Sequence, residues 1–308
     1  GFLRMSSTGL SAQAKGAQNN TLESAKVLWQ TVAVALLLGG AVLVLQSPIL
    51  SVGLTLTQPN SDVALHLQHY FSTRVWGAPA AMLNLALVGW LVGQQKTRSV
   101  MTIQIVGNLL NATLDVIFVF GLNLSVAGVA LASVIAEYTM AIMALVVAFK
   151  QVGGVAVSAS WFNRAARKVL MKLNGDMLLR NLALQGCLAF LTIQGARYGE
   201  TSAAVNAILM QFFVLIALGL DGIAYGVEAL VGEAKGASNT AEIKRRTYQG
   251  LVWSSIFALI YSLIFYAAGE AIIELLTEHG GIVRAALPYL SLMVLLPLLA
   301  HWCFLYDG

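Results

Sequence analysis

The sequence predicts an all-α membrane protein that crosses a lipid bilayer many times. Of its 308 residues, 58% are hydrophobic and only 10% are charged, whereas soluble proteins have about 25% charged residues. The apolar residues form runs long enough to cross the roughly 30 Å of bilayer hydrocarbon as helices. The connections between these runs are alternately rich and poor in lysine and arginine, as in other polytopic membrane proteins. Together these observations argue against a soluble enzyme of this size.

Eight apolar runs predict full or nearly full membrane spans, and a shorter apolar segment at residues 1–17 precedes them. The spans are expected at residues 25–46, 76–95, 100–121, 125–149, 176–198, 203–232, 246–268 and 285–307. Residues 62–75 are amphipathic and are expected to lie at the membrane surface, before the span at 76–95. Because the chain opens and stops within apolar runs, we expect it to be a fragment that lacks both ends.

Lysine and arginine residues orient the predicted spans. Alternate connections hold 13 of these residues, and the intervening connections hold 3. The rich connections contain Lys15, Lys26, Lys96, Arg98, Lys150, Arg164, Arg167, Lys168, Lys172, Lys235, Lys244, Arg245 and Arg246, and the poor ones contain Arg74, Arg197 and Arg284. Cytoplasmic connections carry the excess of basic residues, so the rich set is expected in the cytoplasm. The net charge of +4 then reflects topology and indicates no nucleic-acid partner.

A short sequence repeats within the chain. Ala14-Lys15-Gly16-Ala17 recurs as Ala234-Lys235-Gly236-Ala237, at an offset of 220 residues. A weaker match pairs the segments around Pro79 and Pro297 at nearly the same offset. Six predicted spans separate the two copies, so both copies have the same orientation in the membrane. This pattern predicts parallel repeats, each of six helices, in a protein of twelve.

Three polar residues in one predicted span are candidates for ion binding. Asn108, Asn111 and Asp115 are separated by three and four residues, which places them on one face of a helix. A carboxylate flanked by carboxamides can bind a sodium ion or accept a proton. The alternative is that these residues form hydrogen bonds between helices.

Other acidic residues within predicted spans are candidates for lining a transport cavity. Asp221 and Glu228 are seven residues apart and share a helical face. Glu137 could either line such a cavity or pair with a structural partner. The sequence has no nucleotide-binding glycine-rich loop and no catalytic-triad pattern. We therefore expect no enzyme activity, no catalytic residues and no metal site.

Several short segments together resemble the multidrug and toxic compound extrusion (MATE) family, specifically its DinF-like branch. They are residues 2–10, 107–115, 134–138, 204–207, 220–225 and 307–308, and their order and spacing carry the resemblance. The resemblance implies a two-lobe bundle of parallel six-helix repeats, with about 8–9 of the 12 helices present. The N-lobe would cover 1–150 (the end of helix 2 to helix 6), a cytoplasmic linker 151–175, and the C-lobe 176–308 (helix 7 to part of helix 10).

The resemblance also implies a function. Such a protein would be a secondary active antiporter that exports amphiphilic or cationic organic compounds by alternating access, coupled to the entry of H⁺ or Na⁺. It would be a multi-pass monomer in the bacterial inner membrane, with the lipid bilayer and amphiphilic substrates as its partners and without a cofactor. The alternative is a flippase for lipid-linked precursors or polysaccharides, from the same wider superfamily. A flippase is expected to have a strongly cationic cavity, whereas the charges predicted within the membrane here are mainly acidic.

The family pattern assigns candidate roles to individual residues. Asn111 and Asp115 match the cation site of the N-lobe, and Ser133 stands where family members place a hydroxyl in the same cavity. Asp307 matches an acidic residue of helix 10 that takes part in cation coupling in the C-lobe. A glutamate that some members use on helix 7 falls near Gln185, which is not acidic. This departure favours proton coupling in the N-lobe over a sodium site in the C-lobe.

Overall fold

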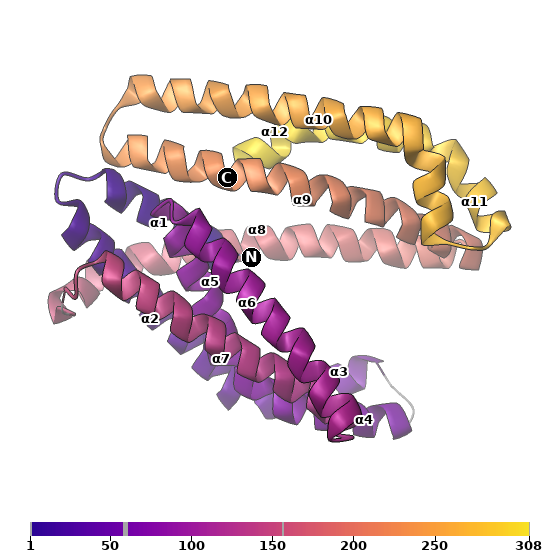
Figure 1. Cartoon of the computed structure of the whole chain (residues 1–308), viewed down its shortest axis with the longest axis horizontal. Coiled ribbons are helices and arrows are strands. Elements are labelled where there is room, and N and C mark those ends of the chain that lie inside the picture. The colour runs from indigo at the N-terminus through magenta and orange to yellow at the C-terminus, as the bar shows by residue number, and fades with distance from the viewer. Residues whose placement is uncertain (1, 58–60, 156, 308) are drawn as a thin grey trace. The chain divides into compact units, whose positions relative to one another are not determined.

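The computed structural model describes residues 2–57, 61–155 and 157–307, and their regular structure is helical throughout (Figure 1). The α-helices are α1 Phe2–Gly16, α2 Asn20–Val44, α3 Gln46–Thr57, α4 Ser61–Arg74, α5 Ala78–Gly93, α6 Thr97–Val116, α7 Ser125–Gln151, α8 Arg164–Arg197, α9 Glu200–Gly236, α10 Thr240–Leu276, α11 Gly280–Ala286 and α12 Leu290–Asp307. Short 3₁₀ turns cover Val75–Gly77, Ala159–Phe162 and Leu287–Tyr289, and a π-helical turn covers Ile117–Gly121.

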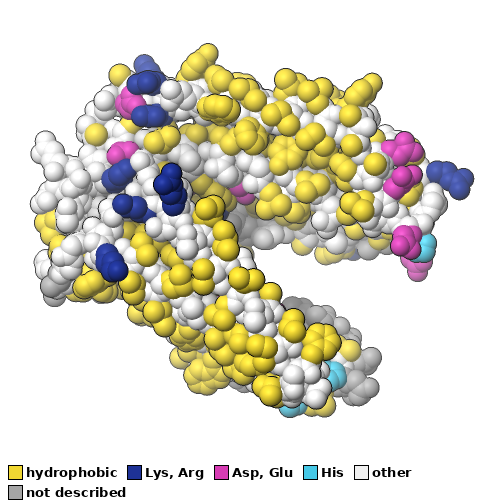
Figure 2. All heavy atoms as spheres, in the orientation of Figure 1, with side chains coloured by type: hydrophobic (Ala, Val, Ile, Leu, Met, Phe, Trp, Pro, Cys, Tyr) yellow, Lys and Arg dark blue, Asp and Glu magenta, His cyan; other side chains and the backbone are white. Residues whose placement is uncertain are grey.

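Within the described residues, eight helical stretches are long and apolar enough to cross a membrane. They are Asn20–Val44, Val63–Gly93, Thr97–Gly121, Ser125–Gln151, Asn174–Gly195, Glu200–Gly236, Thr240–Leu276 and Gly280–Asp307. Hydrophobic side chains cover much of the visible surface, as expected for helices that face lipid (Figure 2). The predicted all-α polytopic fold is therefore confirmed.

One expected surface helix is instead joined to the span that follows it. Residues 62–75 correspond to α4, which continues through the 3₁₀ turn at Val75–Gly77 into α5. The helical stretch that contains this span accordingly runs from Val63 to Gly93, much longer than the span expected at 76–95. As a result Arg74, expected in an external connection, lies within the helical stretch that is long enough to span the membrane.

The chain divides into two compact units, Gly1–Gly175 and Asp176–Gly308, which are described separately. In the first unit, α1, α2 and α5 pack around the buried Trp90 and Leu87. Ser7 and Ser11 of α1 donate hydrogen bonds of 2.7 Å to the carbonyl oxygens of Ala86 and Trp90 in α5. Small hydroxyl residues allow membrane helices to approach closely and join them by hydrogen bonds, so the segment 2–10 serves as a packing surface.

In the second unit, α9, α10 and α12 contact one another just as α1, α2 and α5 do in the first. Phe212 and Phe265 meet edge to face in its core, with ring centroids 4.8 Å apart. Ser262 of α10 donates a 2.7 Å hydrogen bond to the carbonyl oxygen of Val294 in α12. Each unit thus joins three helices, in the same chain order, through apolar packing and serine hydrogen bonds.

The repeated sequence forms the same helical turn in both units. α1 ends at Gly16 and α2 begins at Asn20, whereas α9 ends at Gly236 and α10 begins at Thr240. The residues before the second helix, Asn19 and Asn239, have φ angles of −104° and −97°. The offset of 220 residues therefore relates two interhelical turns of matching length.

Candidate ion-coupling site

The polar face of α6 is held against α7 by a close approach of the two helices. Gly107 precedes Asn108 on α6, and a side chain at Gly107 would overlap that of Met140 on α7. The absence of a Cβ therefore sets the distance between these helices at the level of the predicted site. Asn108 itself is exposed, while Asn111 and Asp115 are half-buried.

Asn111 and Ser133 meet between α6 and α7, as the family pattern implied. The Asn111 Nδ2 donates to the Ser133 Oγ at 3.3 Å. This orientation leaves the Asn111 Oδ1 and the Ser133 hydroxyl proton directed to other partners. The site thereby gathers a carboxamide oxygen and a hydroxyl next to the carboxylate one helical turn along α6.

The Asp115 carboxylate carries a buried oxygen that lacks a hydrogen-bond partner among the described residues. The Oδ1 atom of Asp115 is inaccessible to solvent and accepts no hydrogen bond there. An unsatisfied buried acceptor destabilises a fold by about 1–3 kcal/mol, and more when the group is charged. A bound proton or cation would remove this cost, so Asp115 is suited to carry one.

A π-helical turn begins two residues after Asp115. It covers Ile117–Gly121, and the Leu124 N–H donates to the Phe118 carbonyl oxygen at 2.9 Å across its end. Gly128 of α7 faces Phe118 at a distance that leaves little room for a side chain. π-Helical turns occur often at functional sites. The sequence Ile-Phe-Val-Phe is as hydrophobic as an ordinary membrane span, so nothing in it predicts this turn.

Glu137, on α7, is paired with an arginine in the same unit. Arg74 grips its carboxylate with both terminal nitrogens, Nη1 to Oε2 at 2.9 Å and Nη2 to Oε1. The side chains of Arg74 and Glu137 are 29% and 17% exposed. Gly77 leaves the space that the pair occupies, because a Cβ there would lie 2.5–2.7 Å from both charged groups. Glu137 therefore has an ion-pair partner in Arg74, and a role in lining a cavity stays a prediction.

The acidic residues of the second unit lie in different surroundings. Asp307 of α12 pairs with Arg180 of α8 through Oδ2 and Nη2, and its carbonyl oxygen accepts from Arg180 Nη1 at 3.1 Å. On α9, Glu228 is 8% exposed and Asp221 is half-buried. A role for Asp221 and Glu228 in lining a cavity stays a prediction, as does cation coupling at Asp307.

Comparisons with known proteins point to one family. The sequence model described as MatE matches residues 2–117 and 177–308. The chain is 39% identical over 312 aligned positions to "DNA damage-inducible protein F" of Escherichia coli, covering all of this chain and 67% of that protein. It is 30% identical over 193 positions to "Protein DETOXIFICATION 43" of Arabidopsis thaliana, covering 62% of this chain and 36% of the relative.

A solved structure has the same fold. The "Crystal structure of MATE in the bent conformation" superposes with a TM-score of 0.89 at 18% identity, and covers 99% of this chain and 68% of its own chain. The chain therefore spans about two thirds of the bacterial relative and of this solved structure, and a little over a third of the plant relative.

Proposed function

Because the chain belongs to the MatE family, whose members are transporters rather than enzymes, we propose that the protein carrying it is a secondary active antiporter. It would export amphiphilic or cationic organic compounds by alternating access. The acidic character of the charges at membrane depth supports this substrate class, because carboxylates attract cationic compounds. Similarity along the whole chain to an Escherichia coli protein supports the bacterial inner membrane as its location.

The coupling ion binds at Asp115 in this proposal, and the observation that carries it is its buried Oδ1 atom, which has no hydrogen-bond partner among the described residues. Glu137 and Asp307, in contrast, are each paired with an arginine. An arginine beside a carboxylate competes with any other cation for it. Asp115 is therefore better placed than Glu137 or Asp307 to exchange its ion during transport.

The ion itself is a proton in this proposal. One carboxylate oxygen is enough to hold a proton, whereas sodium requires several oxygen ligands arranged around it. The site offers the Asp115 carboxylate, the Asn111 carboxamide and the Ser133 hydroxyl. Transport driven by imposed gradients separates the two ions: a proton gradient alone should support export, and a sodium gradient alone should not. Export driven by a sodium gradient alone would identify Na⁺, and not H⁺, as the coupling ion.

The Asp115→Asn variant tests the coupling residue. In the full-length protein it should abolish export driven by a proton gradient in inverted vesicles, because a carboxamide neither accepts a proton nor carries the compensating charge. Expression should stay near the wild-type level, since the buried oxygen no longer bears a charge. Asp176→Asn is the matched control, because Asp176 is exposed at the start of the second unit. Wild-type transport by Asp115→Asn would contradict the proposal.

A flippase for phosphate-bearing lipid precursors receives less support. Such a headgroup would require arginine or lysine side chains available to phosphate. Arg74 and Arg180, both on helices that are candidate spans, are each bound to a carboxylate. A phosphate would have to displace these carboxylates, which makes the exporter the better-supported function.

A further inference from the structure

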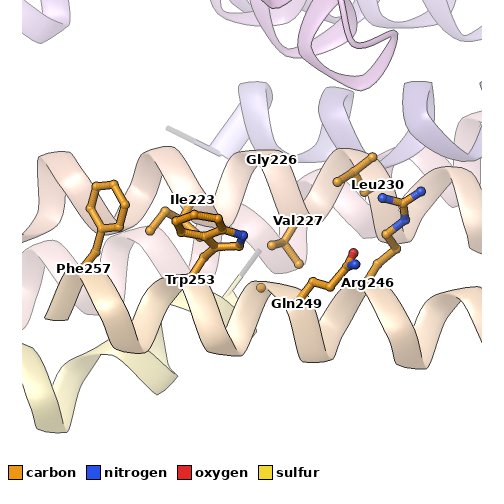
Figure 3. Close-up of a pocket in the computed structure, with 9 residues that line it drawn as sticks. Ile223, Gly226, Val227, Leu230, Arg246, Gln249, Trp253 and Phe257 are labelled. Atoms are coloured by element: carbon orange, nitrogen blue, oxygen red, sulfur yellow. The ribbon is translucent and has the colours of Figure 1, made fainter. Parts of the chain in front are cut away.

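A groove with one apolar end and one cationic end runs along α9 and α10. It has a volume of about 390 Å³. Its walls are formed by Ile223, Gly226, Val227 and Leu230 of α9, and by Arg246, Gln249, Gly250, Trp253 and Phe257 of α10. Figure 3 shows these side chains in a row between the two helices, with Phe257 and Trp253 at one end and Arg246 at the other. The groove lies entirely within the second unit.

The length of the groove matches one leaflet of a bilayer. Arg246 and Phe257 are eleven residues apart on α10, which corresponds to about 16 Å at the helical rise of 1.5 Å per residue. Half of the bilayer hydrocarbon measures about 15 Å. An acyl chain that enters the groove beside Arg246 would therefore reach Phe257 near the middle of the membrane.

The cationic end of the groove suits an anionic headgroup. The end of α9 and the start of α10 carry Lys235, Lys244, Arg245 and Arg246 against two acidic residues, Glu233 and Glu242. The Arg246 Nε donates to the Glu242 Oε1 at 2.6 Å. This bond fixes the guanidinium and uses only Nε, so both Nη groups can donate to a phosphate. Basic clusters next to membrane helices recognise anionic lipids in this way.

The space inside the groove depends on Gly226. A Cβ built at Gly226 meets no atom within 4 Å, so the position opens directly onto the groove. Trp253 opposite is 58% exposed, and its neighbour Ile256 is 41% exposed. An acyl chain could pack against the indole ring of Trp253 and occupy the space that Gly226 leaves by having no side chain.

We propose that this groove binds an anionic phospholipid of the cytoplasmic leaflet, with one acyl chain between Gly226 and Trp253 and the phosphate at Arg246. The polarity of the groove, its one-leaflet length and the basic excess at its end all fit that lipid. The cytoplasmic side follows from the bias of lysine and arginine towards this turn. The inference is independent of the transported compound and of the coupling ion.

Native mass spectrometry of the full-length protein in detergent tests the proposal. The protein is titrated with phosphatidylglycerol and, separately, with phosphatidylcholine of the same acyl chains. The first phosphatidylglycerol molecule to bind should have a lower dissociation constant than the first phosphatidylcholine molecule. Arg246→Gln should weaken it about fivefold, the factor that one basic residue contributes near a membrane surface, while leaving phosphatidylcholine unchanged. Arg284→Gln, which removes an arginine from the opposite end of the unit, should change neither lipid.

A second pair of variants tests the groove itself. Gly226→Leu fills it and should remove the tight phosphatidylglycerol site. Gly222→Leu is the matched control, because Gly222 is also a glycine of α9 with open space around it but does not line the groove. Phosphatidylglycerol with brominated acyl chains should quench wild-type fluorescence more than Trp253→Phe fluorescence. Equal binding of both lipids, or wild-type binding by Gly226→Leu, would overturn the proposal, as would a groove closed to lipid by another segment of the protein.

Discussion

At the scale of single residues, the carboxylates differ in the partners that the structure gives them. Glu137 is held by Arg74 at two points, and Asp307 is held by Arg180. Asp115 has a buried oxygen without a hydrogen-bond partner among the described residues. Taking charges out of water is costly unless they are compensated, so removing one partner of a paired carboxylate should destabilise the fold. The Asp115 oxygen is where we propose that the coupling ion binds.

The Arg74–Glu137 pair leads to a prediction about stability. Arg74→Gln and Glu137→Gln should each lower the free energy of unfolding by about 2 kcal/mol, which is less than a fully buried pair because both side chains are partly exposed. The double variant should lose less than the sum of the two, since neither charge is then left alone. Thermal unfolding in detergent of the wild type, the two single variants and the double variant measures the interaction energy between the two side chains.

Transport by the double variant distinguishes a structural pair from a coupling group. If the pair only stabilises the unit, the double variant should retain proton-driven export at a temperature below its unfolding transition. Loss of export in a folded double variant would instead give Glu137 a part in transport. Lys26→Gln with Glu23→Gln is a control, because these residues form a more exposed pair, at 3.3 Å, within one helix.

At the scale of helices, the existence and order of the spans could be predicted, but their breaks could not. Apolar runs of sufficient length identify spans because lipid cannot satisfy an exposed backbone. The 3₁₀ turn at Val75–Gly77 and the π turn at Ile117–Gly121 leave no mark in composition. Arg74 was therefore expected outside the membrane, although it lies within the Val63–Gly93 stretch and reaches Glu137.

The candidate site was likewise predictable only in part. Helical spacing placed Asn108, Asn111 and Asp115 on one face, and the family pattern added Ser133 from the next helix. The contact between Asn111 and Ser133 agrees with that expectation. The arginine partner of Asp307 had no local signal, because Arg180 is 127 residues away in the chain. Pairings over such distances depend on the packing of helices, which the sequence of one helix does not specify.

The packing of α6 against α7 leads to a prediction about the site. Gly107→Ala should push the helices apart at Met140, destabilise the unit by about 1–3 kcal/mol and reduce transport, because the Asn111–Ser133 hydrogen bond lies one turn away. Combining it with Met140→Ala should restore both properties. Gly121→Ala is the control, since a Cβ at Gly121 meets no atom within 4 Å. Unchanged transport in Gly107→Ala would show that the site tolerates a wider separation of the helices.

At the scale of the whole chain, the two units have related helical turns but different candidate sites. Both contain three helices packed in the same chain order, and both begin their second helix after an asparagine at positions 220 residues apart. The carboxylate proposed for ion coupling, Asp115, lies in the first unit, and the lipid groove proposed above lies in the second. On these two proposals, the two units share a packing scheme but differ in function.

The most direct test of the account is to count the protons released when substrate binds. A cationic substrate of the full-length protein is added to purified transporter in weakly buffered detergent solution that contains a pH indicator. Competition between proton and substrate predicts that the wild type releases about one proton per bound substrate and that Asp115→Asn releases none, with Asp176→Asn behaving as the wild type. Equal release from Asp115→Asn and the wild type would contradict the assignment of the coupling ion to Asp115.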